Sequence, residues 1–406
     1  MTLPESGAAP RPSGSGLALL YAARGLRGFG DGFAILILPV YMTALGYGAA
    51  AVGIVATASL LGTALLTLAV GMIAPRFDLR TLLLWGAGLT AATGLAFPAA
   101  EHLAIIAVVA FIGSINPSAG DLGMLVPLEQ AMLARGASDE DRTHVFARYS
   151  LIGALTMAAG SLAASLPDVL QADGVTALAS LRLMFFGYAA LGLASAALYR
   201  RLPHMRAQGQ HHAPLGPSRR TVYKLAALFC IDAFGGGFIA QSLLVLWLFE
   251  RFGLSLSAAA VFFFWSSVLS AFSYPVAAWI AKRAGLVNTM VFTHIPSSIF
   301  LILAPFAPNL YGALGLLLLR SALSQMDVPT RTSYVMAVVT PVERPAAASV
   351  TAVPRSLASA ISPAIAGALL TTALPGLPLV LCGALKIAYD LLLLLSFRHI
   401  RPPEET

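Results

Sequence analysis

The chain has 406 residues, of which 58% are hydrophobic and 11% are charged, and its mean hydropathy is +0.81. Soluble domains carry about 25% charged residues, so this composition excludes a water-soluble fold. The formal net charge is +7, but the basic residues lie in short segments between apolar stretches rather than in one patch, so the sequence predicts no nucleic-acid partner.

Apolar stretches of about 20 residues, long enough to cross ~30 Å of hydrocarbon, follow one another along nearly the whole chain. A polar segment at 1–16 comes first and is expected to be a cytoplasmic tail. Six spans are then predicted at 17–44, 52–74, 82–99, 103–133, 145–166 and 177–198. Six more are predicted at 225–248, 258–281, 287–304, 311–339, 346–370 and 377–395.

The predicted fold class is therefore an all-α membrane protein with twelve transmembrane helices in two pseudo-symmetric six-helix bundles. The N-terminal bundle covers 17–199 and the C-terminal bundle covers 221–397. Between them, the segment 200–220 is rich in Pro, Gly and scattered charge, which predicts a cytoplasmic linker. A short cytoplasmic tail is predicted at 398–406.

The distribution of basic residues predicts the orientation of these spans. The segments on one side contain nearly all of the loop Lys and Arg residues, whereas the other side has only Arg251 among Glu101, Asp168, Asp173 and Glu250. By the positive-inside rule, both termini and the linker face the cytoplasm. The chain is thus predicted to be a multi-pass protein of the inner (plasma) membrane.

An internal repeat relates the two halves. The segment 29–33 reads FGDGF and 234–238 reads FGGGF, 205 residues further on. The segment 126–130 reads VPLEQ and 328–332 reads VPTRT, 202 residues further on. Self-similarity at a fixed offset near half the chain length is typical of transporters built from two repeats.

With these features the chain resembles the major facilitator superfamily over its whole length. The family's loop signature after the second span is G-x-L-A-D-R-x-G-R-K, and residues 71–80 here read GMIAPRFDLR. Gly71, Arg76 and Arg80 match this signature, but Pro75 stands at the usual acid and Asp78 at the usual second glycine. In the second half, 278–285 reads AWIAKRAG, a remnant that keeps Arg283.

The resemblance implies alternating access controlled by a cytoplasmic gate. We expect Glu129 and Glu343 to replace the acid that is missing at Pro75, and so to contact the basic residues of the gate. The candidate gate residues are Gly71, Arg76, Asp78, Arg80, Glu129, Arg283, Glu343 and Arg344.

Ionisable residues inside the predicted spans are the candidates for a solute or proton pathway, because each costs ~2.5–3.5 kcal/mol at the bilayer centre unless it faces a cavity or a partner. The candidates are the ionisable residues Arg24, Arg27, Asp31, Asp232, Arg320, Asp327 and Arg331, together with the neighbouring polar residue Gln325. Helical spacing places the first three on one face of span one, and Arg320, Asp327 and Arg331 on one face of span ten.

Two pairings are expected among the intramembrane charges. Asp232 follows Arg27 by 205 residues, so the two positions are repeat mates, and we expect them to face each other across the centre. Lys386 and Asp390 are four residues apart and are expected to neutralise each other on one helix, outside the site. The lone His294 is interpreted as a packed or hydrogen-bonded histidine, with a proton relay as the alternative reading.

Phosphate-loop, HExxH, CxxC and GxSxG motifs are all missing from the sequence, which predicts a protein that is not an enzyme and uses no cofactor or metal. The favoured function is a secondary active transporter, acting as a monomer, for a small anionic or zwitterionic solute, coupled to protons. Arginine suits carboxylate or phosphate groups.

Two alternatives remain open from the sequence. One is a proton-coupled multidrug-type exporter, for which Phe262, Phe263, Phe264 and Trp265 would offer apolar surface; the absence of a proline from 153–160 counts against it. The other is a membrane sensor or scaffold that kept the fold but does not transport, which the degraded loop signature would suit.

Overall fold

The computed structural model describes residues 14–113, 115, 123–136, 142–205, 215–340 and 342–398. All regular secondary structure in these ranges is helical, which confirms the all-α fold class. The first half contains α1 (Gly14–Ala44), α2 (Ala49–Ile73), the 3₁₀ helix η1 (Ala74–Arg76), α3 (Leu79–Ala99), α4 (Leu103–Ile112), α5 (Leu125–Gly136), α6 (Arg142–Ala163), α7 (Leu166–Ala172) and α8 (Ala177–Tyr199).

The second half contains α9 (Arg219–Gly237), α10 (Gln241–Phe252), α11 (Leu256–Ala284), α12 (Leu286–Leu303), the 3₁₀ helix η2 (Ala304–Phe306), α13 (Leu310–Ser324), α14 (Asp327–Ala337), α15 (Arg344–Leu370) and α16 (Leu377–Phe397). Most of the predicted tails, 1–13 and 399–406, and the centre of the linker, 206–214, lie outside the described residues.

Within the described ranges, nine helical segments are long and apolar enough to cross a membrane. The predicted spans at 17–44, 103–133 and 311–339 are not among them. The first corresponds to α1, which carries three charged residues, and the other two are divided between shorter helices. The membrane location is shown, whereas the count of twelve stays a prediction for these three segments.

Three spans that were predicted to be continuous are in fact broken. The span 103–133 is divided into α4 and α5, and 311–339 into α13 and α14 at Gln325 and Met326. The span 225–248 is divided into α9 and α10, because α9 ends in three glycines at 235–237 that favour a break in the helix. Pro329 lies in the first turn of α14, where its missing N–H costs nothing, and this favours a new helix start there.

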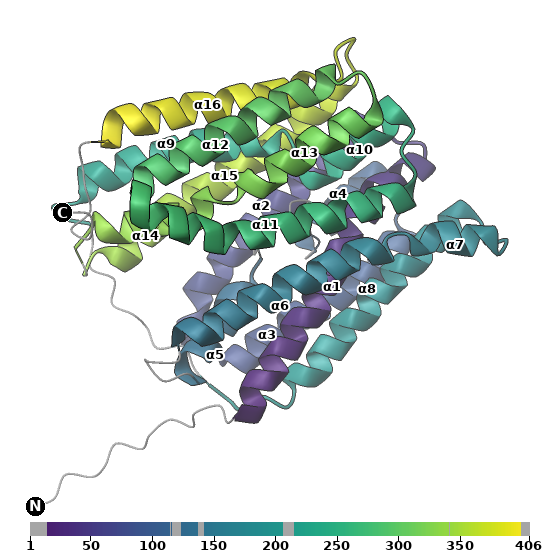
Figure 1. The fold of residues 1–406 in the computed structure, drawn as a ribbon. Coiled ribbons are helices and arrows are strands. Elements are labelled where there is room, and N and C mark those ends of the chain that lie inside the picture. The colour runs from purple at the N-terminus through teal and green to yellow at the C-terminus, as the bar shows by residue number, and fades with distance from the viewer. Residues whose placement is uncertain are drawn as a thin grey trace, which may run out of the picture.

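The two halves form two groups of helices that lie against each other (Figure 1). They meet along two seams, where α2 packs against α15 and α6 packs against α11. In the first seam the backbones approach so closely that a Cβ on Gly53 would collide with the carbonyl of Pro363. Beside this crossing, the Ala364 N–H donates to Thr57 Oγ1 at 2.9 Å.

The internal repeat is visible in the packing. Gly32 lies against the backbone of α6 at Met157, and its repeat mate Gly237 lies against the backbone of α15 at Ser359; a Cβ on either glycine would collide with that carbonyl. Each repeat also forms an edge-to-face pair of phenylalanines one turn apart, with ring centroids 5.9 Å apart in the first half and 5.4 Å apart in the second. The two repeats therefore fold alike around the glycine-rich segment.

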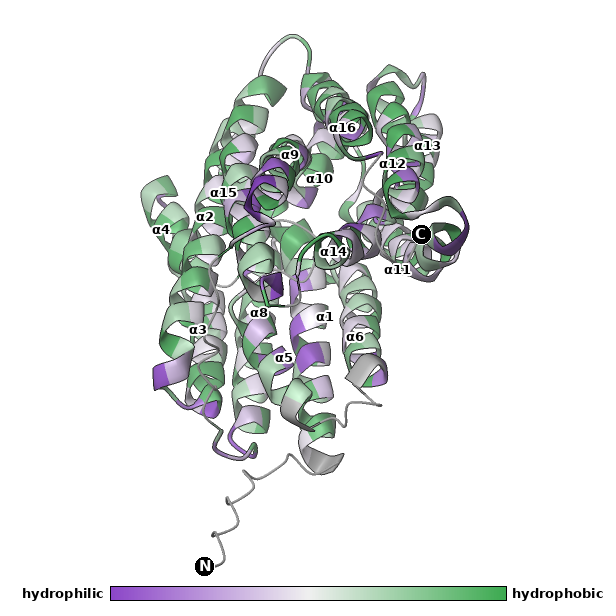
Figure 2. Ribbon diagram, turned by 90° about the vertical axis from the view of Figure 1, so that its left-hand side faces the viewer, coloured by the Kyte–Doolittle hydropathy of each residue, from purple (hydrophilic) through white to green (hydrophobic). Residues whose placement is uncertain are grey.

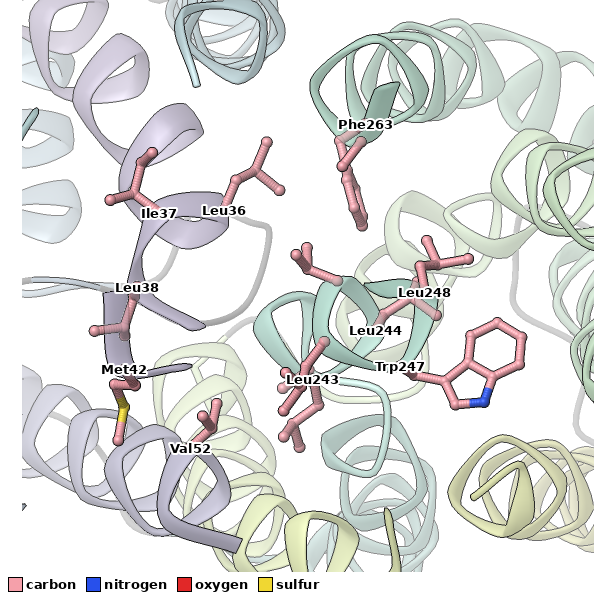
Figure 3. Close-up of a cluster of buried hydrophobic side chains, with 14 of the residues drawn as sticks. Leu36, Ile37, Leu38, Met42, Val52, Leu243, Leu244, Trp247, Leu248 and Phe263 are labelled. Carbon is pink, nitrogen blue, oxygen red and sulfur yellow. The ribbon is translucent and has the colours of Figure 1, made fainter. Parts of the chain in front are cut away.

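The halves are joined at one end of the molecule and separate at the other. At the end remote from the linker, side chains of both halves share one apolar core, in which Leu243 of α10 lies on the side of its helix nearer to Leu36 and Met42 of α1, and the Trp247 ring lies on the far side of α10 (Figure 3). At the linker end, the buried apolar residues form two separate clusters, one from residues of the first half and one from residues of the second half. We therefore call the far end closed and the linker end open, because no apolar cluster of described residues at the linker end is shared by both halves.

Many large apolar residues are exposed on the outside of the bundle, and hydrophilic residues are found on interior helices such as α1 and α9 (Figure 2). Trp85 is 74% exposed and Phe272 is 66% exposed. Exposed apolar surface of this kind is what a lipid bilayer covers.

Candidate solute and coupling site

A closed ion pair lies inside the first half. Arg27 on α1 donates from Nη2 to Glu129 Oε2 on α5 at 2.6 Å and to the Tyr149 hydroxyl on α6 at 2.9 Å. The hydroxyls of Tyr149 and Tyr199 both donate to the Glu129 carboxylate, whose side chain is fully buried. One cation and two hydroxyls therefore satisfy this carboxylate.

The other two charged residues of α1 also lie inside the first half. The Arg24 guanidinium lies 5.2 Å from the centre of the Tyr149 ring and packs on Gly153 of α6. Asp31 accepts a hydrogen bond from the Tyr188 hydroxyl of α8 at 3.2 Å. The predicted charged face of α1 therefore contacts α5, α6 and α8 of its own half.

The second half contains a larger ionic cluster around Asp232 on α9. One carboxylate oxygen of Asp232 accepts from Arg331 Nη1 on α14 at 3.1 Å, and the other accepts from Lys386 Nζ on α16 at 2.6 Å. The same Arg331 nitrogen lies 3.0 Å from Asp327, one helical turn earlier. The guanidinium of Arg331 also stacks over the Phe229 ring, 5.4 Å from its centre.

A histidine extends this cluster to a third acid. Lys386 Nζ lies 3.4 Å from His294 Nε2, and His294 Nδ1 lies 3.1 Å from both oxygens of Asp390. A lysine ammonium can only donate, so Nε2 accepts and the proton of a neutral imidazole is on Nδ1, facing Asp390. The polar groups thus form one continuous chain from Arg331 to Asp390 across α14, α9, α16 and α12.

The expected pairing of Arg27 with Asp232 is wrong. Each residue pairs within its own half, Arg27 with Glu129 and Asp232 with Arg331. Glu129 and Arg331 are themselves repeat mates, 202 residues apart, so both halves build the same pair of positions with opposite charge. The two repeat offsets together could have predicted these pairs. Each half has a charged residue at both repeated positions, the two charges in a half are opposite, and so each pair can form inside its own half.

The expected pairing of Lys386 with Asp390 is also wrong. Although the spacing allows a contact, Lys386 turns to Asp232 and Asp390 turns to His294. Asp232 accommodates both cations because each of its two carboxylate oxygens accepts from one of them. Lys386 and Asp390, which the sequence placed outside the site, therefore join the polar network around Asp232. His294 is hydrogen-bonded within this network, as one of its predicted roles requires.

The remaining candidates of the second half are less strongly bound. Arg320 on α13 is partly buried, and its backbone carbonyl accepts from Ser297 at 3.3 Å; no acidic partner of its side chain is present among the described residues. Gln325 lies at the break between α13 and α14. Arg355 on α15, which is not among the candidates above, has its strongest electrostatic interaction with Arg331.

The gate candidates of the first half hold the start of the linker. Asp78 accepts from the Met205 N–H at 2.6 Å and from His204 Nδ1 at 2.8 Å, and Arg80 lies 3.1 Å from the other ring nitrogen of His204. Although partial burial opposes it, these hydrogen bonds keep the pKa of Asp78 below its usual value. Gly71 and Arg76 are exposed at the end of α2 and in η1.

The gate candidates of the second half hold the end of the linker. Glu343 accepts from Thr340 Oγ1 at 2.6 Å, from Ser218 Oγ at 2.8 Å and from the Gly216 N–H. These hydrogen bonds, led by those from Thr340 and Ser218, lower the pKa of Glu343 to about 2. Its neighbour Arg344 donates to the Met336 carbonyl at 3.1 Å.

Glu129, one of the two acids expected to replace the missing acid at Pro75, is bonded to Arg27 and two tyrosines. Glu343 bonds to the linker, and Arg283 stacks 3.9 Å above the Trp279 ring. These contacts lie within single halves or along the linker, as the open linker end requires. A role of the eight residues in gating stays a prediction.

In the described part of the chain, no group of three or more His, Cys, Asp or Glu residues is placed to hold a metal ion.

Comparison with known proteins gives three kinds of likeness. The family model of the Major Facilitator Superfamily matches residues 20–322. The Saccharomyces cerevisiae protein described as uncharacterized membrane protein YJR124C is 24% identical over 420 residues, with 94% of each chain covered. Among solved structures, the nucleoside transporter NupG superposes with a TM-score of 0.73 at 14% identity, covering 94% of this chain and 99% of that chain.

Two further structures were solved in an inward-facing state. A bacterial homologue of the iron transporter ferroportin has a TM-score of 0.70 at 15% identity, covering 93% of this chain and 97% of its own. A bacterial homologue of the human lysosomal transporter Spinster has a TM-score of 0.68 at 15% identity, covering 94% of both chains. At such low identities the likeness shows the fold alone.

Proposed function

The chain belongs to the Major Facilitator Superfamily and is a membrane transport protein, and from this we propose that it is a secondary active transporter for a small anionic or zwitterionic solute. Alternating access moves the solute, and protons supply the driving force. The observation that carries the proposal is the position of Asp232, which is 3% exposed and bridges Arg331 and Lys386 inside an otherwise apolar bundle. A buried ionic cluster of this kind seldom stabilises a fold better than apolar residues would, so function is the better reason for it.

Alternating access is supported by the two different ends of the molecule. The closed end holds few polar contacts between the halves: Asp168 of α7 accepts from the Ser257 N–H at 2.9 Å and from its hydroxyl at 2.5 Å, at the start of α11. Opening that end requires these bonds to break and the apolar core around Trp247 to separate. Closing the linker end requires the two separate apolar clusters to meet.

The charge balance of the second half supports an anionic solute. Its buried or partly buried basic residues inside the bundle are Arg320, Arg331, Arg355 and Lys386, whereas the acids are Asp232, Asp327 and Asp390. With a neutral His294, this half carries one surplus positive charge. A bound anion neutralises that charge, whereas a bound cation adds to it.

Proton coupling is supported by the polar chain from Asp232 through Lys386 and His294 to Asp390. Protonation of Asp232 would release Lys386 and Arg331, so the charge seen by the solute depends on the state of this acid. Histidine is the side chain whose charge changes most readily near neutral pH. Coupling thus requires no group beyond those already in contact.

The multidrug-exporter alternative loses its main support. Phe262 and Phe263 are 5% and 3% exposed and belong to the apolar core that joins the two halves at the closed end. Trp265 is 52% exposed but lies on the outside of the bundle, where lipid covers such side chains. A sensor or scaffold without transport would have no need for the charged cluster around Asp232.

We assign the linker end to the cytoplasm on the charge of its loops, which makes the present state inward-open and places both termini inside the cell. The protein then acts as a monomer in the plasma membrane, and it performs no catalysis.

The test is transport in liposomes that contain the purified protein and a trapped pH-sensitive dye. We expect at least one organic anion, added with an inward proton gradient, to accelerate dye acidification, and Asp232→Asn to abolish this effect. Lys224→Gln, which removes an exposed positive charge from the same helix, is the matched control and should behave like the wild type. Acidification driven by lipophilic cations that are loaded inside the liposomes and leave in exchange for protons, with no effect of organic anions, would favour the drug exporter.

A further inference from the structure

Arg355 differs from Arg331 and Lys386, the two cations of the second half that pair with Asp232. Among the described residues, its guanidinium has no acidic partner, and its Nε atom is buried without a hydrogen-bond acceptor. Its strongest electrostatic neighbour is Arg331, another cation, while Asp232 and Asp327 lie further down the order of influence. Both of these acids are already paired, Asp232 with Arg331 and Lys386, and Asp327 with Arg331.

A second donor near this cluster also has no acceptor. The hydroxyl of Tyr389 on α16 is buried and makes no hydrogen bond within the described residues, although its ring packs edge-on against His294 and Phe229. The Phe229 ring that contacts Tyr389 also lies against the Arg331 guanidinium. A buried donor without an acceptor costs about 1–3 kcal/mol. Arg355 Nε and the Tyr389 hydroxyl are two such donors, and the charge of Arg355 adds to the cost of leaving them unbonded.

A water molecule could accept from both donors, but it would leave the charge of Arg355 uncompensated. An anion would meet both needs, because it accepts hydrogen bonds from the two donors and supplies a negative charge for Arg355. A guanidinium presents two parallel N–H groups that match the two oxygens of a carboxylate. The unsatisfied groups therefore describe a site for a carboxylate.

The depth of Arg355 suits a transport site. It lies 11 residues from the linker-side start of α15, Lys386 lies 11 residues from the linker-side end of α16, and Asp232 lies 13 residues from the start of α9. At 1.5 Å per residue, all three are about 16–20 Å from the linker end of their helices. That layer is near mid-membrane, where alternating access exposes a bound solute to either side.

We propose that Arg355 is the residue that binds the carboxylate of the transported solute, with the Tyr389 hydroxyl as a second donor. The proposal rests on the proposed transport function and names the chemical class of its solute, a monocarboxylate. Without a bound solute, Arg355 lowers the free energy of unfolding, and a bound carboxylate removes this loss. A residue with a purely structural role would have the opposite effect on stability.

The experiment measures thermal unfolding of the purified full-length protein in detergent with benzoate and other monocarboxylates, each compared with its neutral amide, such as benzamide. Binding to the folded state raises the unfolding temperature. We expect Arg355→Gln to unfold at a higher temperature than the wild type when empty, and to lose the carboxylate-dependent rise. Lys386→Gln should unfold at a lower temperature when empty, because it leaves Asp232 with one partner fewer.

For the best carboxylate, we expect Arg355→Gln to weaken apparent affinity by about 10- to 100-fold, the range for a lost hydrogen bond to a charged group, and Tyr389→Phe to weaken it less. Arg355→Lys, which keeps the charge but not the planar fork, should fall between Gln and wild type. Lys224→Gln should leave the affinity unchanged.

The outcomes separate the two proposals. Carboxylates that stabilise wild type and Arg355→Gln equally would overturn the role of Arg355 and leave the anion transporter standing. A lower unfolding temperature of empty Arg355→Gln would show that Arg355 is a structural residue, and it would overturn the inference as well. Stabilisation by amides and amines but by no carboxylate would overturn both the inference and the anionic solute.

Discussion

The two halves place an ion pair at the same two positions of their repeats and treat it differently. In the first half Arg27 on α1 binds Glu129 on α5, and in the second half Asp232 on α9 binds Arg331 on α14, with the signs of the charges exchanged. The first pair is completed by two tyrosine hydroxyls and ends there. The second recruits Asp327 and Lys386, and through Lys386 it reaches His294.

From this difference we infer that the second half contains the proposed coupling site. A carboxylate held by one guanidinium and two neutral hydroxyls has no spare charge to offer a ligand, so the pair in the first half suits a rigid support. An acid shared by two cations, with a third cation nearby, changes the charge of its surroundings by one unit whenever it takes up a proton. Symmetric positions in a repeat therefore predict contacts, whereas the neighbours that each half adds decide the function.

The largest expected effect compares the two acids directly. Asp232→Asn leaves Arg331 and Lys386 sharing a neutral amide, and we expect it to lower the free energy of unfolding by about 3–5 kcal/mol. Glu129→Gln leaves one guanidinium beside two hydroxyls that can still accept, so its loss should be smaller. Equilibrium unfolding of both variants in mixed micelles measures the difference, and equal losses would remove the distinction between the halves.

A smaller effect is expected from the hydroxyls that complete the first pair. Tyr199→Phe removes one hydrogen bond to a buried carboxylate and should cost about 1.5–3 kcal/mol. If the first half is only a support, the variant should transport normally once folded, so uptake per folded molecule is measured beside unfolding. Tyr188→Phe, at the Asp31 contact of α8, is the matched control for loss of a tyrosine hydroxyl in the same half. A strong loss of transport in Tyr199→Phe would give the first half a direct part in the reaction.

The contact between the halves at the closed end should have a modest effect. Asp168→Asn weakens the two hydrogen bonds from Ser257, so the closed end should open more often. Each is worth about 1.5–3 kcal/mol when the acceptor is charged and less when it is neutral, so we expect the open population to rise several-fold. Labelling of a cysteine placed at Leu244, in the core of the closed end, measures this population. Asp173→Asn, on the same side of the membrane, should leave labelling unchanged.

The smallest expected effect concerns the linker and its dependence on pH. The pKa of Glu343 is about 2 in the folded state, below the ~4.3 of an unfolded glutamate, so its contribution is complete above the unfolded value and is lost as pH falls toward 2. The two pKa values set the pH range of the effect. Hydrogen exchange of the Gly216 and Ser218 amides, corrected for intrinsic rates, should therefore accelerate as the pH falls from about 4 to about 2. Glu343→Gln should remove this dependence. Protection that is constant across the range would show that the linker is held by other contacts.

Much of the fold could be predicted from the sequence, because crossing a bilayer imposes length and apolar composition on each helix separately. Nine spans, the family and the two-fold repeat follow from such local properties. The breaks inside 103–133, 225–248 and 311–339 could not, because interior helices can be interrupted wherever packed neighbours satisfy the freed backbone groups.

The candidate site divides in the same way. The sequence by itself determined which charges lie inside the membrane, since a span must contain whatever residues its length encloses. Only the tertiary structure decided their partners: Arg27 pairs with Glu129 rather than with Asp232, and Lys386 pairs with Asp232 rather than with Asp390. Helical spacing limits a side chain to a face, but several helices meet at that face, and the strongest contact among them depends on how closely their backbones approach. The glycines that set this approach, such as Gly32 and Gly237, act between helices far apart in the chain, and so the pairing is a property of the packed bundle.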